Sequence, residues 1–309
     1  MSYQSKFGNW DNRASVRTKP ARHLADHDTT PLFFPPESVP ATTHALVTAR
    51  GPETLHRVLV HSLHQYLRFT TVLEQAAVLP VTARISLGDS GVDLPAGMLR
   101  DAFKITTDEA WHAQYSDGFA GEVALVTGIA PDAVVRPQFL GRLERIRLDV
   151  EPSLRGLVEL VFAVVSETLV SALLSDIPKD GRLPGPVRAL VADHAADEGR
   201  HHAYFRSFLS ILWPQLSARE RQVLGPRIPA LVHAFLAPDL GAVRATLRAS
   251  GFAEREVAEI MADSYGPDSP AFLVEPAARA TVRCFREVGA LADAATLHAF
   301  AAGGLLAER

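Results

Sequence analysis

Hydrophobic residues recur three and four positions apart over most of the chain after Gly51, which is the spacing of one helix face. This pattern predicts four long helices, over residues 52–79, 97–117, 154–176 and 185–212. Prolines and glycines separate them, at Pro80, at Gly118 and Gly121, at 178–186 and at Trp213-Pro214. Shorter helical patterns follow over 217–235, 253–263, 270–291 and 294–306, and residues 81–92 have the pattern of a short β-hairpin. We therefore predict an all-α fold with a core bundle over about 52–212 and additional C-terminal helices over 217–309.

The first 50 residues have a different pattern, because prolines interrupt them at positions 20, 31, 35, 36 and 40. Proline lacks a backbone N–H and restricts the residue before it, so a regular helix is not expected here. We expect residues 1–50 to form an extended arm packed on the body, and residues 51–309 to form a single helical domain. Within that domain, Ser217-Ala-Arg-Glu220 has the form of a capping box and predicts a helix start at Ser217.

The longest apolar run, residues 157–174, contains two acids, Glu159 and Glu167. Carboxylates inside a run of this length argue against a lipid-facing helix and favour a helix buried inside the protein. Two buried carboxylates need partners, because leaving a charge unpaired in an apolar interior is costly. We expect the buried partners to be other polar side chains or metal ions.

Composition excludes several classes of protein. The 309 residues are 47% hydrophobic and carry 31 basic against 35 acidic side chains, a net charge of −4. This balance gives no reason to expect binding to nucleic acid or to a membrane surface. The single cysteine, Cys284, excludes a disulfide within the chain and any cysteine-rich metal site. The polar N-terminus lacks an apolar signal segment, so we expect a cytoplasmic protein.

The chemistry is indicated by a repeated motif, Asp-Glu-x-x-His, at Asp108-Glu109-Ala-Trp-His112 and again at Asp197-Glu198-Gly-Arg-His201. On a helix, its glutamate and histidine lie one turn apart on one face, where they can bind a common ion. A further glutamate precedes each motif on the previous helix, Glu74 by 35 residues (109 − 74) and Glu167 by 31 (198 − 167). Glu159 fits this repeat less well, and the sequence leaves its role open.

Two glutamates from two helices, together with Glu-x-x-His from two others, is the pattern of ferritin-like bundles with a dinuclear metal site. Four carboxylates balance the charge of two divalent ions, and donors without thiolates suit iron or manganese. Asp108 and Asp197 point about 100° away from the neighbouring glutamates, so we expect them to hydrogen-bond to metal-bound imidazoles of adjacent helices. His194 lies within about 60° of the face of Glu198 and His201, which makes a third imidazole available.

These elements resemble the AurF-type p-aminobenzoate N-oxygenases, a family of non-haem di-iron enzymes. The resemblance rests on Glu74, on Glu109-x-x-His112, on Glu167 and on His194-x-x-x-Glu198-x-x-His201, in that order. Asn9-Trp10, Arg13–Arg17 and Phe34–Pro40 also look like the family's leading segment. The resemblance implies a centre of two iron ions, for which manganese can substitute, held by Glu74, Glu109, His112, Glu167, His194, Glu198 and His201. It further implies that O2 is the co-substrate and that a primary amine is oxidised to a hydroxylamine, nitroso or nitro product in specialised metabolism.

The substrate is expected to be a small-molecule or carrier-bound amine, either an arylamine or one derived from an amino acid. We assign Tyr66, Thr70 and Ala163 to its pocket. Because no Gly-x-Gly-x-x-Gly fingerprint of a flavin or nicotinamide site is present, we expect an external electron donor, a ferredoxin or a reductase. A homodimer is also expected.

Other functions stay open at this point. The nearest is a di-iron C-hydroxylase or desaturase, and a ferroxidase or iron-binding bundle and a metal-free helical interaction protein belong to other classes. A radical-generating reductase subunit would need an aspartate where Glu74 stands and a tyrosine one position after Tyr115. We interpret His61 and His64 as ordinary helix residues, and the basic stretch 136–147 as a solvated face.

Overall fold

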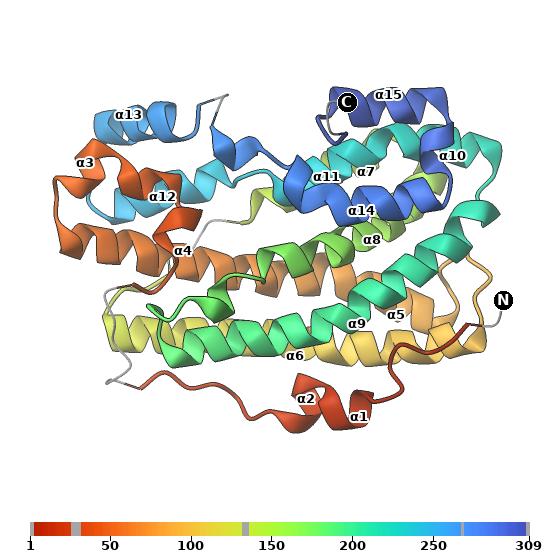
Figure 1. Cartoon of the computed structure of the whole chain (residues 1–309), viewed down its shortest axis with the longest axis horizontal. Helices are drawn as coiled ribbons and strands as arrows, with labels where there is room; N and C mark the ends of the chain where they lie inside the picture. Colours follow the sequence, from red (N-terminus) through yellow and green to blue (C-terminus); the bar gives the residue numbers. More distant parts are fainter. Residues whose placement is uncertain (1–2, 26–31, 132–135, 267–268, 307–309) are drawn as a thin grey trace.

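The computed structural model describes residues 3–25, 32–131, 136–266 and 269–306, and every regular element among them is a helix. The centre of the molecule is formed by four long helices, α4 (Pro52–Leu73), α6 (Ala96–Thr127), α8 (Arg155–Leu173) and α9 (Gly185–Gln215). They run along the long axis of the molecule (Figure 1). Helix α4 packs on α6, α8 packs on α9, and α6 also contacts α9. The all-α prediction is confirmed.

The chain after α4 remains helical, so the prediction of a β-hairpin over residues 81–92 is wrong. Helix α4 passes into a π-helix, η4 (Glu74–Val78), and then into α5 (Leu79–Leu87). Pro80 is the second residue of α5, where a missing N–H is tolerated because the π-turn already interrupts the regular hydrogen-bond ladder. Val81 and Ile85 are both buried and lie four residues apart, which is the spacing of one helix face.

The predicted end of the helix over 97–117 is also wrong, because packing overrides local breakers. Helix α6 continues through Gly118 and Gly121, where no neighbouring atom approaches the Cβ position, and it buries Phe119 and Val123 beyond them. A glycine costs an exposed helix about 1 kcal/mol, which the burial of two large apolar side chains exceeds. Helix α6 ends at Gly128, which has a φ of 68° and serves as a left-handed C-cap. Helix α9 ends at Gln215, three residues beyond its predicted end, and includes Pro214 in its last turn.

The proline-rich arm packs on the bundle, but it is not extended throughout. Its short helical turns are α1 (Trp10–Arg13), α2 (Ser15–Thr18), η2 (Pro36–Ser38), η3 (Pro40–Thr43) and α3 (Ala45–Thr48). Helix α2 contacts both α6 and α9, and Phe7, Trp10 and Phe33 are buried. In Figure 1 the arm runs beneath α6 and α9 and returns to the body near α4.

The remaining helices cover the other side of the bundle. They are α7 (Gln138–Leu148), η5 (Pro152–Leu154), η6 (Ile177–Lys179), α10 (Ala218–Leu224), η7 (Gly225–Arg227), α11 (Ile228–Leu236), α12 (Leu240–Ala249), α13 (Glu254–Ser264), η8 (Pro270–Phe272), α14 (Glu275–Glu287), η9 (Ala290–Ala292) and α15 (Ala294–Ala302). Helices α7, α11 and α14 pack on α8, which explains why so apolar a helix is buried. Ser217 and Glu220 form the predicted capping box at the start of α10. Among the helices of the described residues, none is both long and apolar enough to cross a bilayer.

Candidate metal centre

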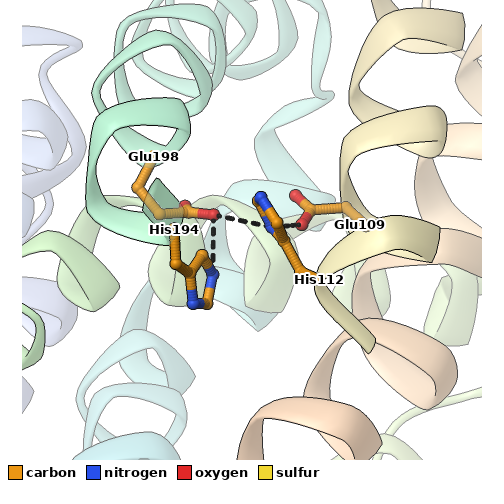
Figure 2. A group of neighbouring side chains, drawn as sticks. All are labelled: Glu109, His112, His194 and Glu198. Carbon is orange, nitrogen blue, oxygen red and sulfur yellow. Dashed lines mark hydrogen bonds and ion pairs between the residues drawn. The ribbon is translucent and has the colours of Figure 1, made fainter. Parts of the chain in front are cut away.

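The structure brings together all seven residues that the sequence predicts as metal ligands. Helix α6 contributes Glu109 and His112, and α9 contributes three residues at its middle turns; Glu74 begins η4 and Glu167 lies on α8. The complete set is Glu74, Glu109, His112, Glu167, His194, Glu198 and His201, and each is at most 1% exposed. Four of them, from two facing helices, are drawn in Figure 2. A cluster of seven buried polar side chains therefore lies at the centre of the bundle.

Within this cluster, two groups have ligand atoms that lie within 4.8 Å of one another. One contains Glu109, His112, His194 and Glu198; the other contains Glu109, Glu167, Glu198 and His201. Glu109 and Glu198 are common to both. Two overlapping groups with two shared carboxylates have the donors needed to hold two ions side by side, because each carboxylate has two oxygens and can bridge.

Two of the histidines are oriented by aspartates from the opposite helix. His112 Nε2 lies 3.1 Å from Asp197 Oδ2, and His201 Nε2 lies 3.2 Å from Asp108 Oδ2. An ionised carboxylate only accepts, so each Nε2 carries the hydrogen and donates it. In a neutral ring, Nδ1 then has its lone pair free. This nitrogen faces Glu109 in both residues: His112 Nδ1 lies 2.8 Å from Glu109 Oε2, and His201 Nδ1 lies 2.9 Å from Glu109 Oε1. This is the tautomer that a metal ligand requires.

The N-terminal arm holds these aspartates in turn. The Trp10 indole N–H donates to both oxygens of Asp108 at 2.9 Å, and the Ser15 backbone N–H lies 3.2 Å from both oxygens of Asp197. Arg200 also pairs with Asp197. Sequence reasoning missed these roles of Trp10 and Ser15, although both lie in the leading segment that resembles the family. The arm therefore completes the surroundings of the cluster from outside the four-helix bundle.

The third histidine occupies the same side of the cluster as Glu74. His194 Nε2 is 3.1 Å from Glu198 Oε1 and 3.8 Å from Glu74 Oε1, and its ring centroid is 4.2 Å from that of His112 (Figure 2). Among the described residues no aspartate bonds to this ring, and its nearest carboxylate is that of Glu198. The environment of His194 thus differs from that of the two aspartate-held histidines.

Electrostatics in the ion-free cluster are those of crowded, buried acids. Burial, reinforced by neighbouring carboxylates, raises the pKa of Glu74 and of Glu167 well above the ordinary glutamate value. Burial opposes the charge of His112, but its bonds to Asp197 and Glu109 outweigh this and raise its pKa to about 10. Burial also opposes ionisation of Glu198, yet the positive charge of His201 is strong enough to lower the pKa of that carboxyl. Protons and imidazolium charge therefore occupy the place that cations would fill.

The donor atoms fit a pair of metal ions. One oxygen each of Glu74, Glu167 and Glu198 is fully buried and accepts no hydrogen bond from a described residue. A buried polar atom without a partner is destabilising, and coordination to an ion would satisfy all three oxygens. Four carboxylates and three imidazoles, without thiolate, form a donor set suited to iron or manganese.

Glu159, whose role the sequence leaves open, lies outside the cluster. Its carboxylate is 2.8 Å from Arg84 and 3.6 Å from Arg147, so it faces polar partners nearer the surface. Tyr115 is half-buried beside the cluster, with its ring centroid 5.6 Å from that of His112 and 6.4 Å from that of His194. Its aromatic ring therefore forms part of the wall.

Of the three residues predicted for a substrate pocket, Tyr66 lines a cavity of about 730 Å³ between α4, α6, α12 and the arm. Thr70 and Ala163 do not line this cavity. Both are buried one helical turn before a glutamate of the cluster, Thr70 before Glu74 and Ala163 before Glu167. All three residues therefore lie on the helix faces that lead to the cluster.

Comparison with known proteins agrees with this arrangement. Residues 8–289 match the model of a protein family described as P-aminobenzoate N-oxygenase AurF. The chain is also 27% identical over 261 residues to a 4-aminobenzoate N-oxygenase from Streptomyces thioluteus, a match that covers 82% of this chain and 76% of that protein. The family match contains all seven clustered residues together with Trp10 and Ser15. The chain therefore belongs to the AurF family of ferritin-like p-aminobenzoate N-oxygenases.

Proposed function

We propose that the cluster holds two iron ions in unequal positions. Glu74, His112 and His194 would hold one ion, Glu167 and His201 would hold the other, and Glu109 and Glu198, which belong to both donor groups, would be shared between them. The observation that carries this proposal is the pair of overlapping donor groups that share those two glutamates. Manganese can occupy the same donors. The surrounding helices over residues 51–309 would then form one di-iron domain, with residues 1–50 as an arm that supports it.

When bound, the two irons supply the redox chemistry that activates O2 for transfer of an oxygen atom. The chain's own residues orient the histidine rings and exclude water from the cluster. Asp108 and Asp197 accept from Nε2 of His201 and His112, so Nδ1 of each ring faces the cluster and would give up any proton it carries when an ion binds. Buried residues of α8, including Phe162 and Val164, belong to the apolar core around the cluster, which limits access of water.

We propose that the oxidised atom is the nitrogen of a primary amine, an arylamine or an amine derived from an amino acid. The product would be a hydroxylamine, nitroso or nitro compound of specialised metabolism. The family match and the named activity of the Streptomyces thioluteus relative support this choice over a di-iron C-hydroxylase or desaturase and over a ferroxidase. The proposal includes an external electron donor, a ferredoxin or reductase, and a homodimeric cytoplasmic enzyme.

A product assay tests the function. Iron-loaded, reduced protein is mixed with ¹⁸O-labelled O2 and a panel of aryl and alkyl amines, and the products are identified by mass. We expect labelled oxygen on nitrogen. Oxygen found only on carbon would favour the C-hydroxylase, and iron oxidation without any organic product would favour the ferroxidase.

A further inference from the structure

A chain of hydrogen bonds connects the surface of the arm to one histidine of the cluster. The Trp10 indole N–H donates to both oxygens of Asp108 at 2.9 Å, and Asp108 Oδ2 accepts from His201 Nε2 at 3.2 Å. On the other side of the same ring, His201 Nδ1 lies 2.9 Å from Glu109 Oε1. Asp108 and His201 have no exposed surface, whereas Trp10 is 9% exposed. Trp10 is therefore the member of this chain that reaches the outside of the protein.

The corresponding contacts in the other half of the cluster do not include such a ring. Asp197, which accepts from His112 Nε2, is held by the Ser15 backbone N–H and by Arg200. Apart from the two histidines, Trp10 is the one aromatic side chain among the described residues that bond to either aspartate. Electronic coupling decays less steeply across conjugated rings, bonds and hydrogen bonds than across gaps. The chain through Trp10 is therefore the better route for electrons between the surface and the cluster.

The arm around Trp10 is basic, although the whole protein has a net charge of −4. Residues 3–25 have a net charge of +4 (5 − 1), from the basic residues Lys6, Arg13, Arg17, Lys19 and Arg22 and the acidic residue Asp11. The Arg17 guanidinium carbon lies 5.6 Å from the centre of the Trp10 ring. Lys6, Arg13 and Lys19 are exposed, and none of them forms an ion pair with another described residue. This positive surface would attract an acidic partner to the exposed edge of Trp10.

We propose that the basic arm is the docking face for the external electron donor, an acidic protein of the ferredoxin type, and that Trp10 and Asp108 conduct its electrons to His201. This inference rests on the proposed function and names its partner and the route of the electrons. Each reduced ferredoxin loses one electron and each ferric ion gains one, so two donors reduce one centre. Trp10 begins and ends the transfer unchanged, and no covalent bond forms or breaks.

Docking is tested by calorimetry, with an oxidised, acidic plant-type ferredoxin and the full iron-loaded chain at low ionic strength. Arg13→Glu combined with Lys19→Glu should weaken binding about tenfold, because two attractive charges become repulsive. Arg244→Glu combined with Arg255→Glu is the matched control and should leave the Kd unchanged. Both control residues are exposed, on α12 and α13, across the molecule from α1 and α2 (Figure 1). An unchanged Kd in the arm variant, or no binding to the unaltered protein, would overturn the docking face.

The route is tested by stopped flow without O2, as the limiting rate at which saturating reduced ferredoxin changes the visible absorption of the oxidised iron centre. Samples are matched for iron content by elemental analysis. Trp10→Phe removes the indole N–H and should lower this rate about tenfold or more, while its Kd for ferredoxin stays unchanged. The arm charge variant should show the opposite pattern, a weaker Kd with an unchanged limiting rate. Trp213→Phe, at a buried tryptophan outside the arm, is the control and should change neither quantity.

A small reductant separates a role in the route from a structural role. Reduced methyl viologen is a cation that needs no docking face, so it should reduce Trp10→Phe and the unaltered protein at equal rates. Equal slowing with methyl viologen and with ferredoxin would make the role of Trp10 structural. An unchanged limiting rate with ferredoxin in Trp10→Phe would remove Trp10 from the route, and a failure of ferredoxin to reduce the unaltered protein would overturn the proposal as a whole.

The product assay with ¹⁸O-labelled O2 uses chemically reduced protein, so it is independent of ferredoxin. Labelled amine product, together with normal ferredoxin reduction of Trp10→Phe, would keep the N-oxygenase and overturn the route. Reduction that depends on Trp10, with no amine of the panel oxidised on nitrogen, would keep the route and overturn the N-oxygenase.

Discussion

The two halves of the buried cluster have similar side chains but differ in how the backbone presents them. In the first half, η4 carries Glu74 and α6 carries Glu109 and His112; in the second, α8 carries Glu167 and α9 carries Glu198 and His201. Each aspartate hydrogen-bonds to the histidine of the opposite half. Neither half is therefore complete alone, and the centre forms only when the two helix pairs pack together.

The two halves differ in backbone conformation and in their number of histidines, and both differences lie on the same side of the cluster. Glu74 begins a π-helix, whereas Glu167 lies in a regular α-helix, and only α9 adds a third histidine, His194. A π-turn inserts one residue and changes the direction of the side chains around it, which is why such turns are frequent at functional sites. The π-turn begins at Glu74, and His194 Nε2 lies 3.8 Å from Glu74 Oε1, so both differences lie on one side of the cluster. We therefore expect the two proposed ion positions to differ in function.

The largest loss of bound metal is expected when a glutamate that belongs to both donor groups is replaced. Glu198→Ala removes a carboxylate from both groups and should reduce bound metal from about two ions per chain to well below one. Glu167→Ala affects one group and should leave about one ion. Elemental analysis of reconstituted protein measures both. Glu159→Ala, on the same helix as Glu167 but outside the cluster, is the matched control and should keep both ions.

Equal metal loss in the Glu198 and Glu167 variants would contradict the assignment of Glu198 as a bridge. Metal well below one ion per chain in the unaltered protein, after careful reconstitution, would contradict the dinuclear centre itself.

His194→Ala sharpens the contrast between the two ion positions. The other two imidazoles and the four carboxylates still bind the ions, so most of the metal should remain. We expect N-oxygenation to fall at least about tenfold, because the asymmetry near Glu74 is lost. Metal content and the visible absorption change after mixing with O2 are followed on one sample. His202→Ala, at a half-buried histidine outside the cluster, is the control; unaltered turnover in His194→Ala would make His194 a core histidine only.

A smaller loss of metal affinity is expected when the aspartates that hydrogen-bond to the histidines of the opposite half are replaced. Asp108→Asn and Asp197→Asn replace an ionised acceptor with an amide, which orients the opposite histidine less firmly. We expect metal affinity to fall about 10- to 100-fold in each. Trp10→Phe, which removes only the donor to Asp108, should cost less than Asp108→Asn does. Competition with a chelator measures all three, and affinities equal to that of the unaltered protein would show that the crossed hydrogen bonds do not support the site.

The smallest effect is a dependence on pH. Burial and carboxylate repulsion raise the pKa of Glu74 and Glu167 in the ion-free protein, so their stabilising contribution is complete below the ordinary glutamate pKa. It is lost as the pH rises towards the raised values, because both groups must then ionise in the interior. Metal ions remove this penalty by binding the ionised form. We therefore expect the difference in Tm between metal-loaded and metal-free protein to grow as pH rises. Calorimetric scans measure this difference, and a difference that does not change with pH would show that these carboxyls are ionised throughout.

The sequence predicts the bundle and the cluster well because both depend on short-range spacing. Apolar periodicity predicts α4, α6, α8 and α9, and Glu-x-x-His fixes which residues share a face. The path through Pro80 could not be predicted, since a π-turn has no periodic signal of its own. The same holds for the contacts of Trp10 and Ser15, whose partners are 98 and 182 residues away, beyond the reach of any local pattern.

The arm also sets an order of events during synthesis. Ser15 is made early, but Asp197, to which its backbone N–H donates, follows 182 residues later. At bacterial and eukaryotic translation rates of about 5 to 20 residues per second, the arm waits roughly 9 to 36 seconds for that partner. Helices α4 and α6 can pair during this interval, while His112 still lacks its aspartate. A nascent chain can therefore acquire its correctly oriented metal ligands only after α9 has left the ribosome.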